Sequence, residues 1–458
     1  MSFEGEFANY EPLRRIFSSK KVEQFLDELE VCDVASNVTN ILEKVIQKKD
    51  LKNTDNIQPD LILAMDGSVA EASVTKGFPN ANYGYITIAS VLIDMEKIKV
   101  IQSEKFPDPR KVNAIESAST FESVFPGCNV FQSKTEAPKE FLRRKIYEEL
   151  QENSAFPNGG ETLLDTYEYL LDIKLKNSGN PPRCPIEGYE DEDLIIQRGI
   201  YKHAKTGKPL YSTDALRLHE LMNPSGSNGE LFGQIMSAFE KIWFVNILRA
   251  FEKKGWLGTL RRVAFFIDGP LAVFSTPSWL AKSISEEIIR INAEQKKINN
   301  QDMIILGIEK TGIFCNHFQD LDTNREGVKD IFPRETAFLI NDQYIKENII
   351  FSDSIKPYGE DTYFGRKFFY KTSSGKRLIP VVATYSDYEK NSKTANVSQF
   401  SRLKDIMELL DRLVSNRYPN AITPLISAHA EAAIPFNMGQ KLFEQIARQI
   451  IERDKTNG

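Results

Sequence analysis

Two stretches of the sequence decide the expected fold: LILAMDGS at 61–68 and VAFFIDGP at 263–270. Each begins with a continuous apolar run, which is typical of a strand that is buried on both faces of a sheet. The two runs end in Asp-Gly, with the aspartates at Asp66 and Asp268. An aspartate directly after such a strand lies at the carboxyl edge of the sheet, where open α/β folds place their ligands. The two stretches therefore predict an α/β fold with two carboxylates at one edge of its sheet.

The rest of the chain alternates between strand-like and helix-like patterns. Residues 12–50 are interpreted as two helices, because Phe25, Leu26 and Leu29 follow the spacing of an amphipathic helix. The sequence contains no internal repeat, and this order of elements favours one principal mixed sheet flanked by helices. Further strands are expected at 84–93, 303–308 and 377–384, and helices at 138–150, 161–176, about 214–222, 231–254, 279–298, about 400–415 and 439–453.

The chain is expected to have two parts, an N-terminal helical segment at 1–55 and a main domain at 56–458. The main domain is expected to contain an insertion at about 105–228. Within it, residues 177–228 carry proline, glycine, serine and the charged run EDED. This composition is typical of irregular structure.

The composition is that of a globular protein, since 41% of the 458 residues are hydrophobic and 27% are charged. The net charge of −6 argues against a protein that coats nucleic acid, although a carboxylate-rich, cation-binding site also adds negative charge.

No segment approaches the roughly 20 apolar residues that span a membrane. The start MSFEGEFANYEPL resembles no signal peptide, so we expect a cytoplasmic protein. Widely spaced cysteines without a CxxC pair are expected to be reduced thiols: Cys32, Cys128, Cys184 and Cys315.

The two Asp-Gly pairs also suggest a chemistry. If the two strands lie side by side, Asp66 and Asp268 come within reach of one cation, and Mg²⁺ and Mn²⁺ prefer oxygen ligands. Such ions can stabilise the attacking and the leaving oxygen when a phosphodiester is cleaved. The glycine after each aspartate would permit a tight turn and a close approach of substrate to the backbone. The structural alternative is that each Asp-Gly is a turn signal after a strand.

Four segments, in this order, resemble the NurA nuclease family. They are MDGSVAEAS at 65–73, FIDGPLAVF at 266–274, GIEKTG at 307–312 and PLISAHAEAAI at 424–434. The resemblance covers most of the chain and implies that 56–458 is a NurA-type nuclease domain with a ribonuclease-H-like core. It also implies DNA cleavage that depends on Mn²⁺ or Mg²⁺, a homodimer, and a HerA-type hexameric ATPase as partner. The biological task would be DNA end processing, repair or defence against phage.

The resemblance also implies roles for individual residues. Asp66 and Asp268 would be metal ligands, and a third carboxylate is expected on the helix before the second aspartate strand. Glu240 in SAFEKIWFV is the first choice for that metal ligand. Glu252 in RAFEKKG is the alternative, because it lies closer to Asp268 along the chain. Either glutamate could instead be a solvated residue on a helix face.

Two more candidates come from the last two segments. His429 could bind metal or contact the scissile phosphate, and its alternative is a structural role. Lys310 follows the strand at 303–308 and could pair with phosphate or with developing charge, and its alternative is a solvated surface lysine. Because side chains alternate along a strand, we expect only one of Glu309 and Lys310 to face the site.

The other histidines, His203, His219 and His317, lack further ligands at zinc-like spacing and are interpreted as structural. Two small basic clusters could follow a DNA backbone, but a solvated helix face is the favoured explanation for them. These clusters are Arg143-Arg144-Lys145 and Arg261-Arg262.

Two other functions fit parts of the pattern. An actin-like or sugar-kinase-like ATPase also places Asp-x-Gly turns at strand ends. The sequence has no P-loop, however, and Gly365, Gly375 and Gly439 occur singly where a glycine-rich adenosine loop would be needed. A catalytically inert adaptor of a DNA motor could keep the fold without the activity, but both aspartates are retained.

Overall fold

The structure, a computed structural model, describes residues 11–30, 41–73, 78–96, 116–133, 135–156, 160–177, 181–323, 330–414 and 422–433. The expected helix at 439–453 and Cys32 lie outside these residues. No helix in the described ranges is both long enough and apolar enough to cross a membrane. Cys128, Cys184 and Cys315 are free thiols, as the sequence predicts.

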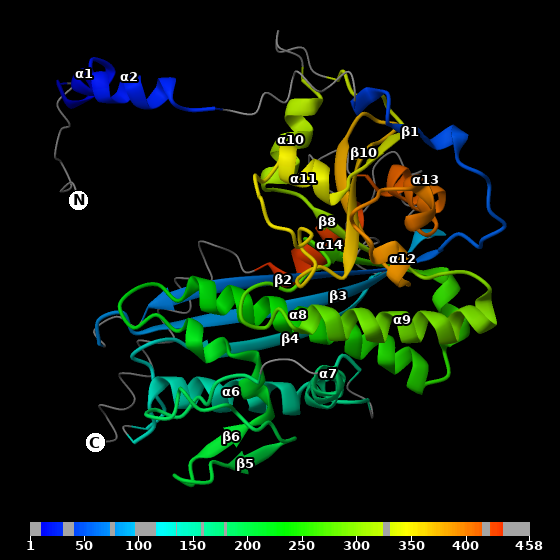
Figure 1. Cartoon of the computed structure of the whole chain (residues 1–458). Coiled ribbons are helices and arrows are strands. Elements are labelled where there is room, and N and C mark those ends of the chain that lie inside the picture. Colours follow the sequence, from blue (N-terminus) through cyan, green and yellow to red (C-terminus); the bar gives the residue numbers. More distant parts are fainter. Residues whose placement is uncertain are drawn as a thin grey trace.

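In the described part of the chain, one mixed sheet of nine strands forms the centre of the molecule (Figure 1). β2, β7 and β8 are parallel to one another, and the other neighbouring pairs in this sheet are antiparallel. The mixed sheet with its flanking helices confirms the expected α/β class. The strand order is β1 (Ile46–Gln47), β9 (Thr336–Leu339), β10 (Gly365–Lys371), β11 (Arg377–Ala383), β8 (Ile304–Glu309), β7 (Val263–Asp268), β2 (Leu61–Ser73), β3 (Asn82–Asp94) and β4 (Glu116–Pro126).

Helices cover both faces of the sheet (Figure 1). α8 packs on β2 and β3, and α7 and α9 pack against α8. α14 also packs on β2 and β3, and it shares its apolar layer with α13. A separate small hairpin is formed by β5 (Ile200–Lys202) and β6 (Pro209–Tyr211). The helices are α1 (Glu11–Phe17), α2 (Lys20–Asp27), α6 (Pro138–Glu152), α7 (Leu163–Lys176), α8 (Gly229–Lys253), α9 (Leu280–Asn299), α10 (Ile313–Leu321), α11 (Asp342–Asn348), α12 (Asp387–Lys390), α13 (Leu403–Leu413) and α14 (Thr423–Ala432).

The alternation of side chains along β2 divides the core into two layers. Leu63 and Met65 belong to the layer that contains α8, whereas Ile62 and Ala64 belong to the layer that contains α13 and α14. Trp243 of α8 is almost fully buried in the first layer. Because both faces of the parallel strands are covered, these strands are continuous apolar runs in the sequence.

β2 is longer than the sequence suggests. The expected strand at 61–65 continues to Ser73, because the whole of β2 forms a hairpin with β3. Gly67 therefore lies inside a strand and not in a turn. The expectation of a tight turn directly after Asp66 is wrong, since pairing with β3 outweighs the Asp-Gly turn signal.

The range in which an insertion is expected, 105–228, contributes β4 to the edge of the main sheet and α6 and α7 to the layer beside α8. β4 is half-buried, with Phe121 and Phe125 inside and Val124 exposed, so it has no continuous apolar run in the sequence. The expected helix at 214–222 is two 3₁₀ turns, Ser212–Leu216 and Leu218–Leu221, which are separated at Arg217 by a φ of +58°.

The N-terminal helices are shorter than the pattern at 12–50 predicts. α1 and α2 lie apart from the sheet in Figure 1. Phe25 and Leu26 of α2 are exposed, and so is Leu29, which follows it. Ile41 is the first buried residue of the described chain and packs with α10 and α11.

The packing of α8 on β3 generates a first prediction. A Cβ atom at Gly84 in β3 would come within 2.3 Å of the Phe232 ring of α8. Gly84→Ala is therefore expected to lower the free energy of unfolding by about 1–3 kcal/mol, because the helix must shift.

Gly233 on α8 is the matched control, since no neighbouring side chain lies within 4 Å of its Cβ position. Gly233→Ala is expected to raise the free energy of unfolding by up to about 1 kcal/mol through helix propensity. Urea denaturation measures both variants. Equal effects of the two substitutions would contradict this packing.

Candidate functional site

The parallel pairing of β2 with β7 brings the two aspartates together. Met65 is in register with Ile267, and each is followed by an aspartate. β7 ends at Asp268, whereas β2 continues, so Asp66 is the first residue of β2 beyond the parallel register. Asp66 and Asp268 line the same cavity, and the charge of Asp268 acts on the carboxyl group of Asp66. Both aspartates therefore lie where the parallel pairing ends, although Asp66 is inside its strand.

The segment after Asp268 turns back over β8. Gly269 adopts a φ of +79°, and its N–H donates to the carbonyl oxygen of Ile308 at 3.0 Å. A Cβ atom at Gly307 of β8 would come within 2.5 Å of the Gly269 carbonyl oxygen. Glycine is required at 307 for this close approach, and the Asp-Gly-Pro-Leu and Gly-Ile-Glu-Lys segments are therefore interlocked.

Lys310 follows the last residue of β8, and its ammonium group lies 2.9 Å from a carboxylate oxygen of Asp268. Glu309 lines the same cavity as Lys310. The expectation that only one of these two residues faces the site is wrong. β8 ends at Glu309, so the alternation of side chains stops there, and Gly312 with a φ of +100° leads the chain into α10.

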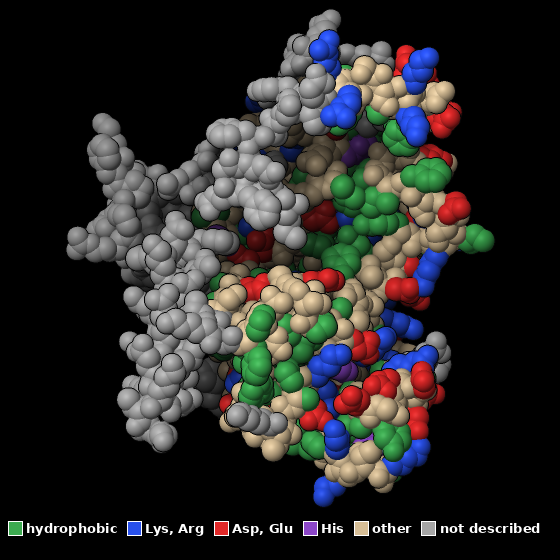
Figure 2. All heavy atoms as spheres, turned by 90° about the vertical axis from the view of Figure 1, so that its left-hand side faces the viewer, with side chains coloured by type: hydrophobic (Ala, Val, Ile, Leu, Met, Phe, Trp, Pro, Cys, Tyr) green, Lys and Arg blue, Asp and Glu red, His purple; other side chains and the backbone are tan. Residues whose placement is uncertain are grey.

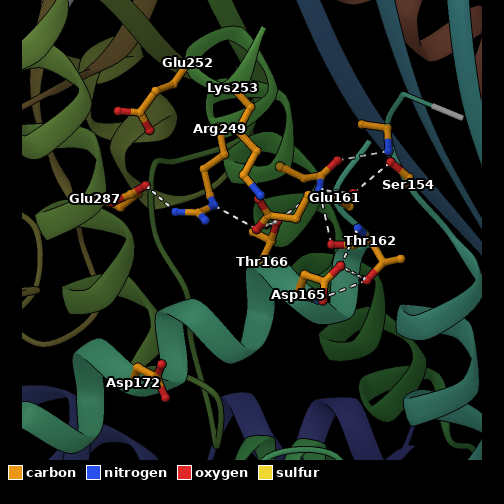
Figure 3. Close-up of polar contacts among 12 residues, drawn as sticks. Ser154, Glu161, Thr162, Asp165, Thr166, Asp172, Arg249, Glu252, Lys253 and Glu287 are labelled. Carbon is orange, nitrogen blue, oxygen red and sulfur yellow. Dashed lines mark hydrogen bonds and ion pairs between the residues drawn. The ribbon is translucent and has the colours of Figure 1, made fainter. Parts of the chain in front are cut away.

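Glu240 reaches the aspartates from the middle of α8, where its side chain is buried and lines the cavity. The alternative, Glu252, lies twelve residues later on the same helix, which is about 18 Å along the helix axis. Its carboxylate pairs with Arg290 at 2.6 Å. Figure 3 shows Glu252 near the polar network of Arg249 and Glu287, whose ion pair measures 2.9 Å. The structure therefore brings Glu240, and not Glu252, to the aspartates.

His429 comes from α14 and approaches Asp66 from outside the cavity lining. Its Nδ1 atom and Oδ2 of Asp66 share a hydrogen bond of 2.7 Å. The hydroxyl group of Thr87 on β3 donates to the carbonyl oxygen of Ala432 at 2.5 Å and so anchors the end of α14. The His429 side chain is 60% exposed, which leaves it open to a substrate.

Asp66, Glu240, Asp268 and Lys310 line one open cavity of about 530 Å³. In the face shown in Figure 2, acidic side chains lie in a hollow next to hydrophobic ones. The cavity has an acidic part and an aromatic part, formed by Asp66, Glu240, Asp268 and Glu309, and by Phe314, Tyr358 and Tyr363.

The aromatic part gave no signal in the sequence. Tyr358 and Tyr363 come from the segment before β10. That segment reaches the site only because β10 pairs with β11 and β11 pairs with β8. Two successive antiparallel pairings of this kind cannot be read from local periodicity.

The carboxyl groups of the site are held closer than their charges favour. Burial raises the pKa of Asp66 to about 8, and the negative charges of Asp268 and Glu240 add to this rise. Lys310 opposes the rise. Burial also raises the pKa of Glu240, against the effect of the neighbouring ammonium group of Lys241. Both carboxyl groups are therefore costly to ionise where they lie.

The donor set fits a hard divalent cation with a partly aqueous shell. The carboxyl groups of Asp66 and Asp268 line one cavity and provide the oxygen ligands that Mg²⁺ and Mn²⁺ prefer. Among the described residues, no three His, Cys, Asp or Glu side chains converge as a complete metal site. Mg²⁺ is commonly held by one or two carboxylates together with water and phosphate oxygens, so this pair of aspartates is a sufficient protein contribution.

The other polar candidates do not line this cavity. Burial lowers the pKa of His219 and of His317 to about 4, which keeps both neutral as expected of structural histidines. Arg143 is buried and forms an ion pair with Asp214 at 2.7 Å. The expectation that Arg143 lies on a solvated face or follows a DNA backbone is therefore wrong, because Asp214 compensates its charge inside the protein.

A protein-family model described as the NurA domain matches residues 60–434. The chain belongs to the NurA family. The match covers the interlocked segments at β7 and β8, both aspartates and His429. The chain matches no curated protein.

Two solved structures are similar to this NurA-family chain. The NurA nuclease from Sulfolobus solfataricus is 13% identical, with 95% of this chain and 98% of that chain covered and a TM-score of 0.31. A structure of NurA with manganese is 10% identical, with 93% and 95% covered and a TM-score of 0.23. The family assignment rests on the match to residues 60–434.

The raised pKa of Asp66 generates a prediction for this NurA-family protein in the presence of a chelator. Between pH about 4 and about 8, the folded chain keeps a proton at Asp66 that the unfolded chain has released. The contribution of Asp66 to stability therefore falls as the pH rises through this window. Asp66→Asn removes the carboxyl group and is expected to become progressively more stable than the wild type towards pH 8.

Urea denaturation across this pH range, with chelator present, measures the difference between the two proteins. A difference in the free energy of unfolding that does not change with pH would contradict the raised pKa of Asp66.

Proposed function

We propose that this NurA-family protein is a divalent-metal-dependent nuclease that hydrolyses phosphodiester bonds in DNA. The observation that carries the proposal is the convergence of Asp66, Asp268, Glu240 and Lys310 on one cavity, where Lys310 lies 2.9 Å from Asp268. Two adjacent carboxylates ionise together at low cost only when a cation lies between them. Phosphate oxygens of DNA and water would complete the shell of that cation.

In this proposal Asp66 and Asp268 would hold Mn²⁺ or Mg²⁺, and the bound ion would supply the means to activate water and to neutralise charge on the phosphate. Lys310, which lies beside Asp268, contacts a non-bridging phosphate oxygen. His429 orients the carboxyl group of Asp66 through Nδ1 and faces the incoming strand with its exposed edge. Glu240 contributes the third carboxylate from α8.

We further propose that the core is ribonuclease-H-like. β2, β7 and β8 pair in parallel, and β2 also begins an antiparallel meander with β3 and β4. The carboxylates lie where the parallel pairing ends. This arrangement supports a ribonuclease-H-like core with its site at one edge of the sheet.

We propose DNA as the substrate, a HerA-type hexameric ATPase as the partner and a cytoplasmic homodimer as the assembly. Membership in the NurA family supports all three. Light scattering of the purified chain tests the dimer, and a monomer at all concentrations would contradict it. Stimulation of cleavage by added ATPase and ATP tests the partner, and unchanged rates would contradict it.

The nuclease activity gives the central functional prediction. The purified protein is expected to cleave linear DNA with Mn²⁺ or Mg²⁺ and to be inactive with a chelator. Asp66→Asn and Asp268→Asn are each expected to lower kcat by roughly a hundredfold or more, because each removes a ligand of the cation. Gel analysis of end-labelled single-stranded and double-stranded DNA measures both the rate and the polarity of cleavage.

Glu252→Gln is the matched control for Glu240→Gln, because both glutamates lie on α8 and only Glu240 lines the cavity. Glu240→Gln is expected to lose activity, and Glu252→Gln is expected to keep it. Full metal-dependent cleavage by Asp66→Asn would contradict the proposed site. A folded wild-type protein that is inactive even with the ATPase would favour the adaptor, and binding of ATP to the chain itself would favour the kinase-like alternative.

A further inference from the structure

Lys367 on β10 is a buried lysine beside the cavity. Its side chain is 5% exposed, and its ammonium group lies 2.8 Å from a carboxylate oxygen of Glu309. A buried ammonium group is costly unless it is paired. Glu309 lines the cavity with the aspartates, so this ion pair connects β10 directly to the site.

Three aromatic rings hold the ammonium group of Lys367 in place. It lies 3.4 Å from the ring centroid of Phe314, 4.6 Å from that of Tyr363 and 5.7 Å from that of Tyr358. It also donates a hydrogen bond to the Tyr363 hydroxyl group at 3.2 Å. Cation–π attraction favours a charged group at these positions. Lys367 therefore has little freedom to leave Glu309.

This ion pair decides how many negative charges face a cation in the cavity. Four carboxyl groups line it, from Asp66, Glu240, Asp268 and Glu309. Lys367 compensates the charge of Glu309 from within the core, whereas Asp268 pairs with the partly exposed Lys310 and Glu240 pairs with its chain neighbour Lys241. Without Lys367, Glu309 would compete with Asp268 for the cation and for the adjacent ammonium group of Lys310.

Lys367 also contacts both ends of the turn that carries Lys310. Glu309 precedes this turn and Phe314 follows it, and Lys367 binds the carboxylate of the first and the ring of the second. The residues between Glu309 and Phe314 lie beyond the end of β8, so side-chain contacts help to fix the path of the backbone there. The position of Lys310 relative to Asp268 depends on these contacts.

We propose that Lys367 is a positioning residue that withdraws Glu309 from the cation-binding carboxylates and holds the turn that presents Lys310 to Asp268. This inference rests on the proposed metal-dependent activity. It assigns Glu309 a role separate from that of the other three carboxylates, although all four share one cavity.

Lys367→Met tests the inference, because methionine keeps most of the apolar volume and leaves Glu309 without its partner. Binding of Mn²⁺ to the full-length protein without DNA is measured by calorimetry. It is expected to become roughly fivefold tighter, since a fourth carboxylate then faces the ion. The kcat for DNA cleavage is expected to fall roughly tenfold with little change in KM, because Lys310 is displaced from Asp268.

Two further variants separate this role from a loss of stability. Glu309→Gln combined with Lys367→Met removes both charges and is expected to restore wild-type affinity for Mn²⁺ while kcat stays low. Lys371, on the same strand, forms a similarly buried ion pair with Asp322 outside the cavity, and Lys371→Met breaks it. This control is expected to lower stability and to leave the affinity for Mn²⁺ unchanged.

Unchanged Mn²⁺ affinity in folded Lys367→Met, or the same change in Lys371→Met, would overturn the inference. If Lys367→Met does not fold, the double variant decides: wild-type Mn²⁺ affinity with a lowered kcat supports the inference, and a wild-type kcat overturns it. The proposed function fails separately, when the wild-type protein neither binds Mn²⁺ nor cleaves DNA.

Discussion

The register between two parallel strands is the constraint on which the site depends. Because β2 and β7 are paired through Met65 and Ile267, the side chains of Asp66 and Asp268 line the same cavity. These groups repel one another when ionised, so the surrounding fold must hold them together. Apolar layers cover both faces of the two strands. Their burial stabilises this arrangement by roughly 25 cal/mol for each Å² of apolar surface removed from water.

Each remaining group reaches this pair through a different part of the fold. α8 crosses one layer and places Glu240 at the cavity, and α14 packs on the same strands and places His429 against Asp66 across a sequence separation of 363 residues. Gly307 lets the turn after β7 lie on β8, which brings Lys310 to Asp268. The charged side chains of the site come from strands, from helices or from turns that pack on them, and such elements hold a site in a fixed geometry.

The sequence predicts the parallel strands and their aspartates because strands covered on both faces are continuous apolar runs. It does not predict that β2 continues beyond Asp66, because residues 66–73 are ordered by pairing with β3 and carry no apolar run of their own. The choice between Glu240 and Glu252 required the position of α8 on the sheet. Lys367, Tyr358 and Tyr363 gave no signal, because antiparallel pairing through β11 brings them to the site. The helix expected at 439–453 stays a prediction.

The most direct test of the central claim is the position of the bound cation. In crystals grown with Mn²⁺, anomalous scattering is predicted to show an ion in contact with carboxylate oxygens of both Asp66 and Asp268. An ion bound elsewhere would contradict the claim that these two aspartates form the metal centre. The absence of any ion at Mn²⁺ concentrations that support DNA cleavage would contradict it as well.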